Sequence, residues 1–264
     1  MHIKQSINLP ALEVEMLREI LQFLRPSEQR QVWLVGGSIR DLLQGHATVP
    51  DLDLATSFNP IGAAREFARA TGAGFVVLDD ERHVVRVVSD TGHGHYTFDI
   101  SEFRAPTIDA DLCARDFTIN SIAAPLFASG ASALANGQIE LYDPLNGIEH
   151  LAAGCIEPSS DQLFTDDPLR LMRAFRFSAL FNAEFSPKLH KMIVAQAHLL
   201  KDVSGERIRD EFFKVLGVAD SARWVRLMDQ TGILQVFLPE LHACHGVEQN
   251  EWHHLDVFEH TLLT

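Results

Sequence analysis

Residues 33–45 read WLVGGSIRDLLQG, and this stretch decides the fold prediction. An apolar run typical of a buried strand ends at two adjacent glycines, Gly36 and Gly37, and an amphipathic helix follows at once. Backbone N–H groups at such a turn and at the start of the helix can approach a phosphate group. The same sequence could form only a tight corner, and the next stretch of the chain helps to decide between the two.

The next stretch, residues 49–56, reads VPDLDLAT and alternates between polar and apolar residues as a strand does. Asp51 and Asp53 are two residues apart, so both side chains leave the same face of the strand. Two carboxylates that point the same way repel each other unless a cation lies between them, and Mg²⁺ prefers carboxylate and phosphate oxygens. The alternative is a solvated strand face, because the pattern Asp-x-Asp is common.

A third carboxylate from a neighbouring strand would complete a two-metal site. Such a site activates a 3′-hydroxyl and stabilises pyrophosphate as it leaves. We expect Asp99, in the predicted strand YTFDISEFR at residues 96–104, to supply this carboxylate. The alternative for Asp99 is an ordinary acid at a strand edge.

Hydrophobic periodicity divides the chain near residue 155 into a mixed α/β first half and a helical second half. In the first half we expect about five strands and helices over residues 11–25, 38–45, 60–72 and 118–127. From residue 161 onward the apolar residues recur with the helical period. We expect helices there over residues 166–181, 187–200, 205–217 and 221–237.

The composition argues against several classes of protein. The chain has 264 residues, a net charge of −14 and three widely spaced cysteines. We expect no signal peptide, because the first residues lack a basic segment followed by an apolar core. We expect no contact with a membrane, because no apolar run approaches the roughly 18 residues of a membrane span. A reducing cytoplasm fits the cysteines best. The acidic balance disfavours a generic nucleic-acid binder, although seven arginines lie between Arg170 and Arg226, where they could serve a ligand.

Several motifs occur in order between about Val32 and Leu216: LVGGSIRDLLQG with DLDLAT, then ARDFTINSIA, DDPLRLMRAFRF and ERIRDE. Together they resemble the class II tRNA nucleotidyltransferase and bacterial poly(A) polymerase family. The resemblance implies an α+β fold, with a polymerase-β-type nucleotidyltransferase head at residues 1–155 and an all-helical neck and body at residues 156–245. It also implies template-independent addition of CMP or AMP to an RNA 3′ end, with two Mg²⁺ ions and with ATP and CTP as substrates.

The resemblance assigns roles to individual residues. Asp51 and Asp53 match the metal ligands of the family. The triphosphate and nucleotide contacts match the glycine turn and the arginines near it, namely Gly36, Gly37, Arg40 and Arg115. Asp116 either orients Arg115 or caps a helix. Ala114 and Asp166 depart from the family pattern, which often has an arginine and a glutamate at these positions.

The same resemblance assigns base reading to Asp167 and Arg170, and phosphate contacts to Arg173 and Arg176, on one neck helix. Residues three apart share a helix face. Aspartate accepts hydrogen bonds and arginine donates them, so the pair matches the donor and acceptor edge of cytosine and adenine and rejects uracil and guanine. A solvated basic face is the alternative. For Glu206, Arg207 and Glu211 we favour ion pairs between helices.

The expected substrate is the tRNA 3′ end, with addition of CCA, CC or A alone. Poly(A) members typically carry a segment resembling GRRFRLAH after the Asp-x-Asp strand, whereas this chain has FVVLDDERHVVRVV, which favours tRNA maturation. The alternatives are a poly(A) polymerase, a non-catalytic RNA-binding member of the fold, and nucleotidyl transfer to a small molecule. The last of these would leave the neck arginines unexplained.

The last stretch, residues 246–264, contains His253, His254 and His260. It resembles the opening of an HD-type metal phosphohydrolase domain, and we expect it to be the start of a truncated segment of that kind. Histidines on amphipathic helices are more often packing or surface residues than ligands, so His260 is assigned no role.

Overall fold

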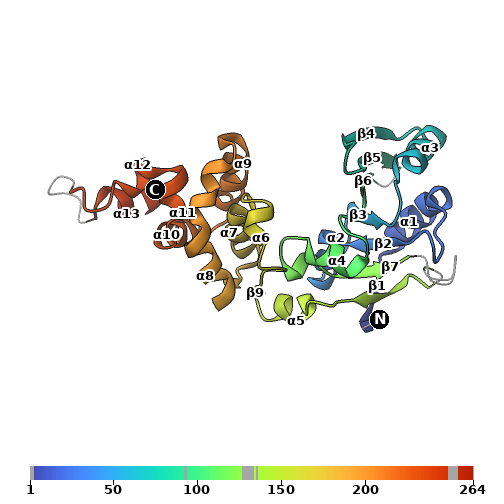
Figure 1. Ribbon diagram of the computed structural model, residues 1–264, viewed down its shortest axis with the longest axis horizontal. Helices are drawn as coiled ribbons and strands as arrows, with labels where there is room; N and C mark the ends of the chain where they lie inside the picture. The colour runs from blue at the N-terminus through green and yellow to red at the C-terminus, as the bar shows by residue number, and fades with distance from the viewer. Residues whose placement is uncertain (1–2, 92–93, 127–133, 135, 249–254, 264) are drawn as a thin grey trace. The chain divides into compact units, whose positions relative to one another are not determined.

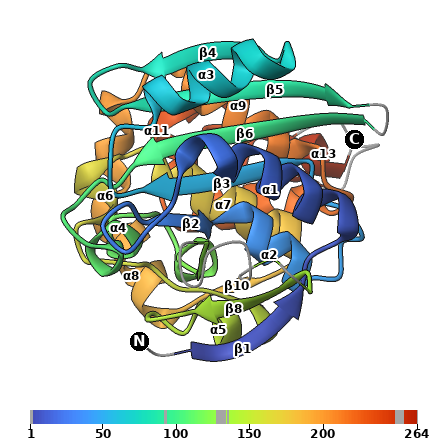
Figure 2. The same cartoon turned by 90° about the vertical axis from the view of Figure 1, so that its right-hand side faces the viewer.

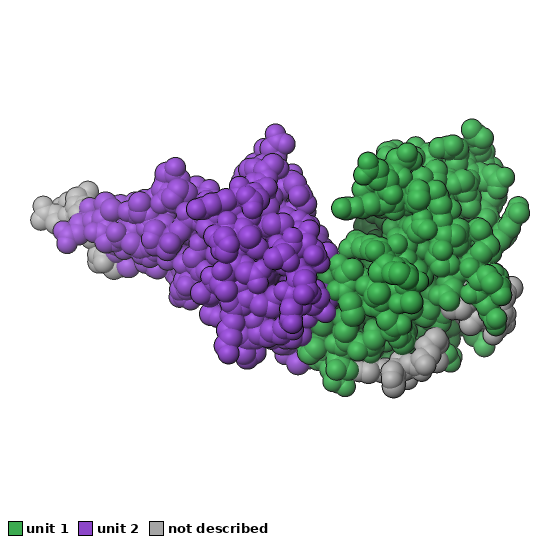
Figure 3. Space-filling view, in the orientation of Figure 1, with its two compact units in different colours: residues 1–151 green, residues 152–264 purple. Residues whose placement is uncertain are grey.

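The computed structural model describes residues 3–91, 94–126, 134, 136–248 and 255–263. Contacts divide the chain into two units, residues 1–151 and 152–264, drawn green and purple in Figure 3. We describe each unit by itself. The division into head, neck and body, and HD-like segment stays a prediction.

The first unit contains a mixed sheet, and its described residues form eight strands in the order β1-β8-β7-β2-β3-β6-β5-β4 (Figure 2). Only β3 and β6 pair in parallel among them. The mixed α+β class is confirmed, but the sheet is larger than the expected five or so strands. The strands are β1 (Ile3–Asn8), β2 (Val32–Val35), β3 (Asp51–Thr56), β4 (Gly74–Asp79), β5 (Val84–Thr91), β6 (Gly94–Glu102), β7 (Ala123–Pro125) and β8 (Gln138–Tyr142).

The predicted helix over residues 118–127 is wrong for residues 118–126, and Phe127 lies outside the described residues. Residues Thr118–Asn120 form a single 3₁₀ turn, η1, and the next residues form the buried strand β7 beside β2. The sequence from Ile122 to Phe127 is continuously apolar, and such a run has no periodicity that separates a helix from a strand buried on both faces. Pro125 ends the strand and would break a helix interior, because it lacks a backbone N–H.

Helices cover both faces of the sheet. α1 (Ala11–Leu24) and α3 (Ile61–Thr71) lie across the front in Figure 2, and the ring of Phe67 packs edge-on against Phe98 of β6 at 5.9 Å. On the other face, α4 (Ile108–Cys113) packs on Trp33 and Val35. Strand β2 is therefore buried on both faces and leads directly into the glycine turn. The other helices of this unit are α2 (Gly37–Leu43) and α5 (Gly147–Ala152), the latter ending at the boundary between the units.

The second unit is built mainly of helices (Figure 1). It also contains a short parallel ladder, β9 (Cys155–Ile156) with β10 (Glu184–Phe185), so the expected all-helical part is not purely helical. The helices are α6 (Leu163–Asp166), α7 (Arg170–Phe181), α8 (Pro187–Gln196), η3 (Ala197–Asp202), α9 (Gly205–Leu216), α10 (Ser221–Gln230), α11 (Ile233–Phe237), α12 (Pro239–His242) and α13 (Val257–Leu263). Within the described ranges, no helix has the length and apolar composition needed to cross a bilayer.

The predicted continuous helix over residues 166–181 is broken. α6 ends at Asp166, Asp167 is extended with φ −152°, and α7 begins at Arg170. The ring of Pro168 disfavours helical geometry at the residue before it, which explains the break. Asp167 therefore lies in a bend between two helices and not on a helix.

Candidate functional site

Three carboxylates lie on one face of the parallel pair β3 and β6. Asp53 is the register partner of Asp99, and Asp51 is the register partner of Thr97. Leu52 and Leu54 point to the opposite face and are fully buried. The expected shared face of Asp51 and Asp53 is thus present, and the strand pairing places Asp99 directly beside Asp53.

The pKa of Asp53 is raised to about 6, chiefly because the carboxyl group is buried and partly because Asp99 lies near it. Arg115, the Gly37 N–H and Arg40 act in the opposite direction and favour the charged carboxylate. A divalent cation bound by Asp51 and Asp53 would relieve this repulsion and replace the lost hydration. Hard carboxylate oxygens beside a polar turn fit Mg²⁺.

The glycine turn lies directly against Asp53. Gly36 has φ +72°, a conformation that favours glycine, and a Cβ added there would lie 3.2 Å from Asp53 Oδ2 and 3.4 Å from Arg115 Nη1. A Cβ added at Gly37 would lie 3.3 Å from Arg40 Nη2 and 3.6 Å from Asp53 Oδ2. The turn, one carboxylate and two guanidinium groups, which sequence reasoning assigned to one site, are therefore together in space.

A polar network orients Arg40. Arg40 donates through Nη1 to Asn120 Oδ1 at 2.6 Å, and Asn120 donates to Asp116 Oδ1 at 2.9 Å. Asp116 also accepts the Phe117 N–H at 2.9 Å, directly before the 3₁₀ turn η1. These contacts tie Arg40 in α2 to the segment that follows α4.

Arg115 is held by a different carboxylate. Asp111 is fully buried and accepts hydrogen bonds from Nε and Nη2 of Arg115 at 3.1 and 3.0 Å. The sequence prediction missed both Asp111 and Asn120. Two signals were available in the sequence. Asp111 lies four residues before Arg115, a spacing at which side chains can pair, and Asn120 is a polar residue within DFTIN.

Arg86 of β5 was also missed. It is the register partner of Asp99 and donates from Nε and Nη2 to the two oxygens of that carboxylate at 2.7 and 2.6 Å. The hydrogen-bonded Asp99 carboxylate raises the pKa of Arg86. The alternation of β5, with Val85 and Val87 buried, placed Arg86 on the polar face. Asp99 thus has an arginine on one side and Asp53 on the other.

In the second unit, Asp167 and Arg170 do not share a helix face, which corrects the prediction. Asp167 Oδ1 accepts the Leu169 N–H at 3.2 Å and lies 3.6 Å from Arg207 Nη2. Arg170 is 8% exposed and donates from Nη1 to the Leu163 carbonyl oxygen at 3.4 Å. The Arg170 N–H also bonds to the Asp167 carbonyl oxygen at 3.0 Å, so the two residues remain adjacent at the start of α7.

Arg173 and Arg176 lie on α7, as predicted. Arg176 pairs with Glu211 of α9 at 3.1 Å, and its guanidinium lies 4.4 Å from the Phe177 ring centroid. The guanidinium of Arg173 approaches the same ring at 5.3 Å. The predicted ion pair between helices is present for Glu211. Among the residues of the last stretch, His253 and His254 lie outside the described part of the chain, and His260 lies on α13.

Comparison with known proteins gives consistent matches. Residues 32–157 match the family described as the poly A polymerase head domain, and residues 183–244 match the probable RNA and SrmB-binding site of polymerase A. The CC-adding tRNA nucleotidyltransferase of Geobacter sulfurreducens is 36% identical over 76% of this chain and 44% of its own length. The A-adding tRNA nucleotidyltransferase of Deinococcus radiodurans is 34% identical over 86% of this chain and 49% of its own length.

A solved complex of a CCA-adding enzyme with ATP superposes with a TM-score of 0.71 and 25% identity, over 96% of this chain and 59% of that one. The fold and the site define the class as a polymerase-β-type head followed by a helical unit. The chain belongs to the class II tRNA nucleotidyltransferase and bacterial poly(A) polymerase family. It spans about half the length of the curated relatives it matches.

Proposed function

We propose that this chain is the nucleotidyl-transferring part of an enzyme that adds CMP or AMP to the 3′ end of tRNA without a template. The observation that carries the proposal is the convergence of Asp53, the glycine turn, Arg40 and Arg115, with Asp99 in register beside Asp53. Carboxylates supply metal ligands, and the arginines and turn N–H groups supply donors for phosphate oxygens. The names of the relatives support tRNA as the acceptor.

In this proposal Asp51 and Asp53 hold Mg²⁺, which would activate the 3′-hydroxyl and stabilise the charge on the triphosphate. Gly36, Gly37, Arg40 and Arg115 bind the triphosphate and orient its α-phosphorus for in-line attack. The new bond joins the 3′-oxygen to this phosphorus as the bond to the bridging oxygen breaks. Pyrophosphate leaves, and the hydroxyl proton passes to solvent.

We further propose that Asp167 and Arg170 select the base, and that Arg173 and Arg176 contribute positive charge. The Asp167 side chain is 35% exposed and can accept from the exocyclic amino group of cytosine or adenine. Arg170 is adjacent to Asp167 at the start of α7 and is the proposed donor to the ring nitrogen of the same base. Asp167→Ala is therefore expected to reduce discrimination against UTP and GTP more than it reduces total incorporation. The control is Arg207→Ala, which removes only the neighbour of Asp167 and so tests whether the carboxylate itself carries the effect.

The deciding experiment supplies each labelled nucleoside triphosphate separately to three acceptors with Mg²⁺. The acceptors are tRNA ending before CCA, tRNA ending after CC, and oligo(A). Incorporation of C or A on a tRNA, lost in Asp53→Ala, supports the proposal and also separates CCA, CC and A addition. Incorporation of A on oligo(A) alone would identify a poly(A) polymerase, and no incorporation on any acceptor would favour a non-catalytic RNA-binding member.

The role of Asp99 is tested separately, because Arg86 offers it a structural partner. If Asp99 binds metal, Asp99→Asn should raise the Mg²⁺ concentration needed for half-maximal incorporation, whereas Arg86→Gln should not. If Asp99 only positions Arg86, the two variants should behave alike.

The proposed cellular location is the cytoplasm, where the free cysteines Cys113, Cys155 and Cys244 stay reduced.

A further inference from the structure

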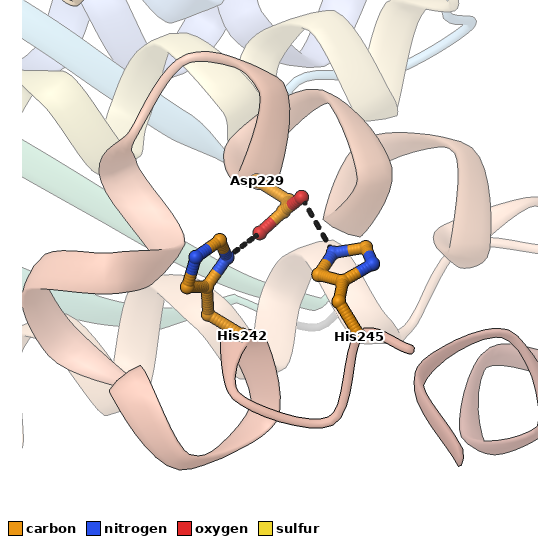
Figure 4. Close-up of side chains that lie close together, drawn as sticks. All are labelled: Asp229, His242 and His245. Carbon is orange, nitrogen blue, oxygen red and sulfur yellow. Dashed lines mark hydrogen bonds and ion pairs between the residues drawn. The ribbon is translucent and has the colours of Figure 1, made fainter. Parts of the chain in front are cut away.

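A second cluster of metal-ligating side chains lies in the second unit, among α10, α12 and the turn after α12 (Figure 4). Asp229 comes from α10, His242 ends α12, and His245 follows three residues later. One ligand atom from each residue lies within 4.8 Å of the others. None of these residues belongs to the nucleotide site proposed above.

Each oxygen of the Asp229 carboxylate faces a different imidazole. Nδ1 of His242 lies 2.6 Å from Oδ1, and Nε2 of His245 lies 2.9 Å from Oδ2 (Figure 4). In tetrahedral zinc sites the bonds are about 2.0–2.2 Å long, so ligand atoms lie roughly 3.3 Å apart. The two hydrogen bonds are shorter than this spacing, and the ligand atoms of all three residues lie within 4.8 Å of one another, so side-chain adjustments of roughly 1 to 1.5 Å would let the three surround one ion.

The surroundings hold these side chains in place. The His245 ring stacks on Phe258 of α13, with centroids 3.9 Å apart and planes 26° apart, and Phe258 is 1% exposed. The Asp229 side chain is 14% exposed, whereas the two histidines are about 40% exposed. The carboxylate is thus fixed at the base of the cluster, and solvent reaches the two imidazoles.

The donor set selects the kind of ion. Two imidazoles with one carboxylate suit Zn²⁺ and related transition metals, whereas Mg²⁺ and Ca²⁺ prefer oxygen ligands alone. The Cys244 thiol lies between the histidines in sequence but donates to the Glu240 carbonyl oxygen at 3.3 Å. It is therefore directed to the backbone of α12.

We propose that Asp229, His242 and His245 form a binding site for one Zn²⁺-type ion, with a fourth position open to water. The ion would join α12 and the following turn to α10. Such a site is separate from the proposed nucleotidyl transfer, because none of its three residues is among those assigned to that reaction. A pair of hydrogen bonds without a metal is the competing explanation for the same geometry.

Binding is measured on the untagged full chain in excess Mg²⁺, which occupies the oxygen-only sites. Equilibrium dialysis gives the number of Zn²⁺ ions bound, and the visible spectrum of the Co²⁺-loaded protein reports the ligand geometry. We expect about one ion per chain at this site. His242→Gln, His245→Gln and Asp229→Asn should each weaken binding at least tenfold and remove the Co²⁺ band.

The matched controls are His190→Gln, an exposed histidine of α8, and Cys244→Ser. Both should bind the ion as the wild type does. Zn²⁺ should also raise the melting temperature of the wild type but not that of the three ligand variants. For each protein, the melting temperature with Zn²⁺ is compared with that of the same protein without metal.

Two results would overturn the proposal. One is the absence of stoichiometric binding at micromolar Zn²⁺. The other is binding that survives in His242→Gln and His245→Gln, or that is lost equally in Cys244→Ser, because the donors would then be different groups. Since three ligand variants are made, the failure of one to fold leaves two that decide the question.

Discussion

Replacing Asp53 by asparagine should stabilise the metal-free protein at neutral pH. The folded pKa of about 6 exceeds the ordinary value of 3.8, so the folded state holds the proton more tightly than the unfolded state does. Stability therefore falls as pH rises from about 4 to about 6, and the full loss is present above that window. A difference of about 2 pH units corresponds to about 3 kcal/mol at pH 7.5 and roughly half of that at pH 5.

The assay is urea unfolding with EDTA at pH 7.5 and pH 5.0. Asp53→Asn should be more stable than the wild type by up to about 3 kcal/mol at pH 7.5, with a smaller gap at pH 5.0. Asp80→Asn, a change at an exposed turn acid, is the control and should leave stability unchanged at both pH values. In Mg²⁺ the order should reverse, because only the wild type retains both metal ligands.

One result would refute the reasoning on Asp53. If Asp53→Asn is less stable than the wild type at pH 7.5 without metal, burial of the carboxylate is not the dominant effect. An equal gap at both pH values would show that the asparagine acts through packing and not through charge.

Two further predictions concern stability. Gly147→Ala should lower the free energy of unfolding by about 3 kcal/mol or more, because the added Cβ would lie 2.1 Å from the Thr118 carbonyl oxygen. Gly62→Ala has nothing within 4 Å of the added Cβ and should stabilise α3 by up to about 1 kcal/mol. Shifts in the urea midpoint check both, and equal effects of the two variants would contradict the packing argument. Arg176→Met should lower the free energy of unfolding by roughly 3 kcal/mol, because it leaves the buried Glu211 carboxylate with only an exposed lysine beside it. Adding Glu211→Leu in a double variant should recover most of this loss. A double variant as unstable as the single one would argue against an uncompensated charge.

Local pattern predicted much of the first unit. The alternation of Asp51 and Asp53 with buried leucines places both acids on one face, because successive side chains of any strand point to opposite sides. The glycine turn after β2 was also readable, since Gly36 adopts a positive φ that other residues disfavour. These features depend on neighbours in sequence, so no tertiary contact was needed to infer them.

Other parts required contacts between distant segments. The helix predicted at residues 118–127 is a 3₁₀ turn and a strand because β2 offers a partner for its backbone. The bend at Asp167 was indicated by Pro168, but the periodic pattern of apolar residues across it favoured one helix. An ion pair between helices was expected for Glu211, but its partner, Arg176, was not predicted. The cluster of Asp229 with two histidines had no local signal.

The sequence by itself determined the two acids on one strand, the corner that precedes them and the family to which the chain belongs. Only the tertiary structure decided that Asp99 lies beside Asp53 and is held by Arg86, and that Asp111 and Asn120 orient the arginines of the site. The physical reason is that side-chain direction within a strand follows from local backbone geometry. The choice of neighbouring strand and the partner of each charge depend on how the whole sheet pairs and buries its faces.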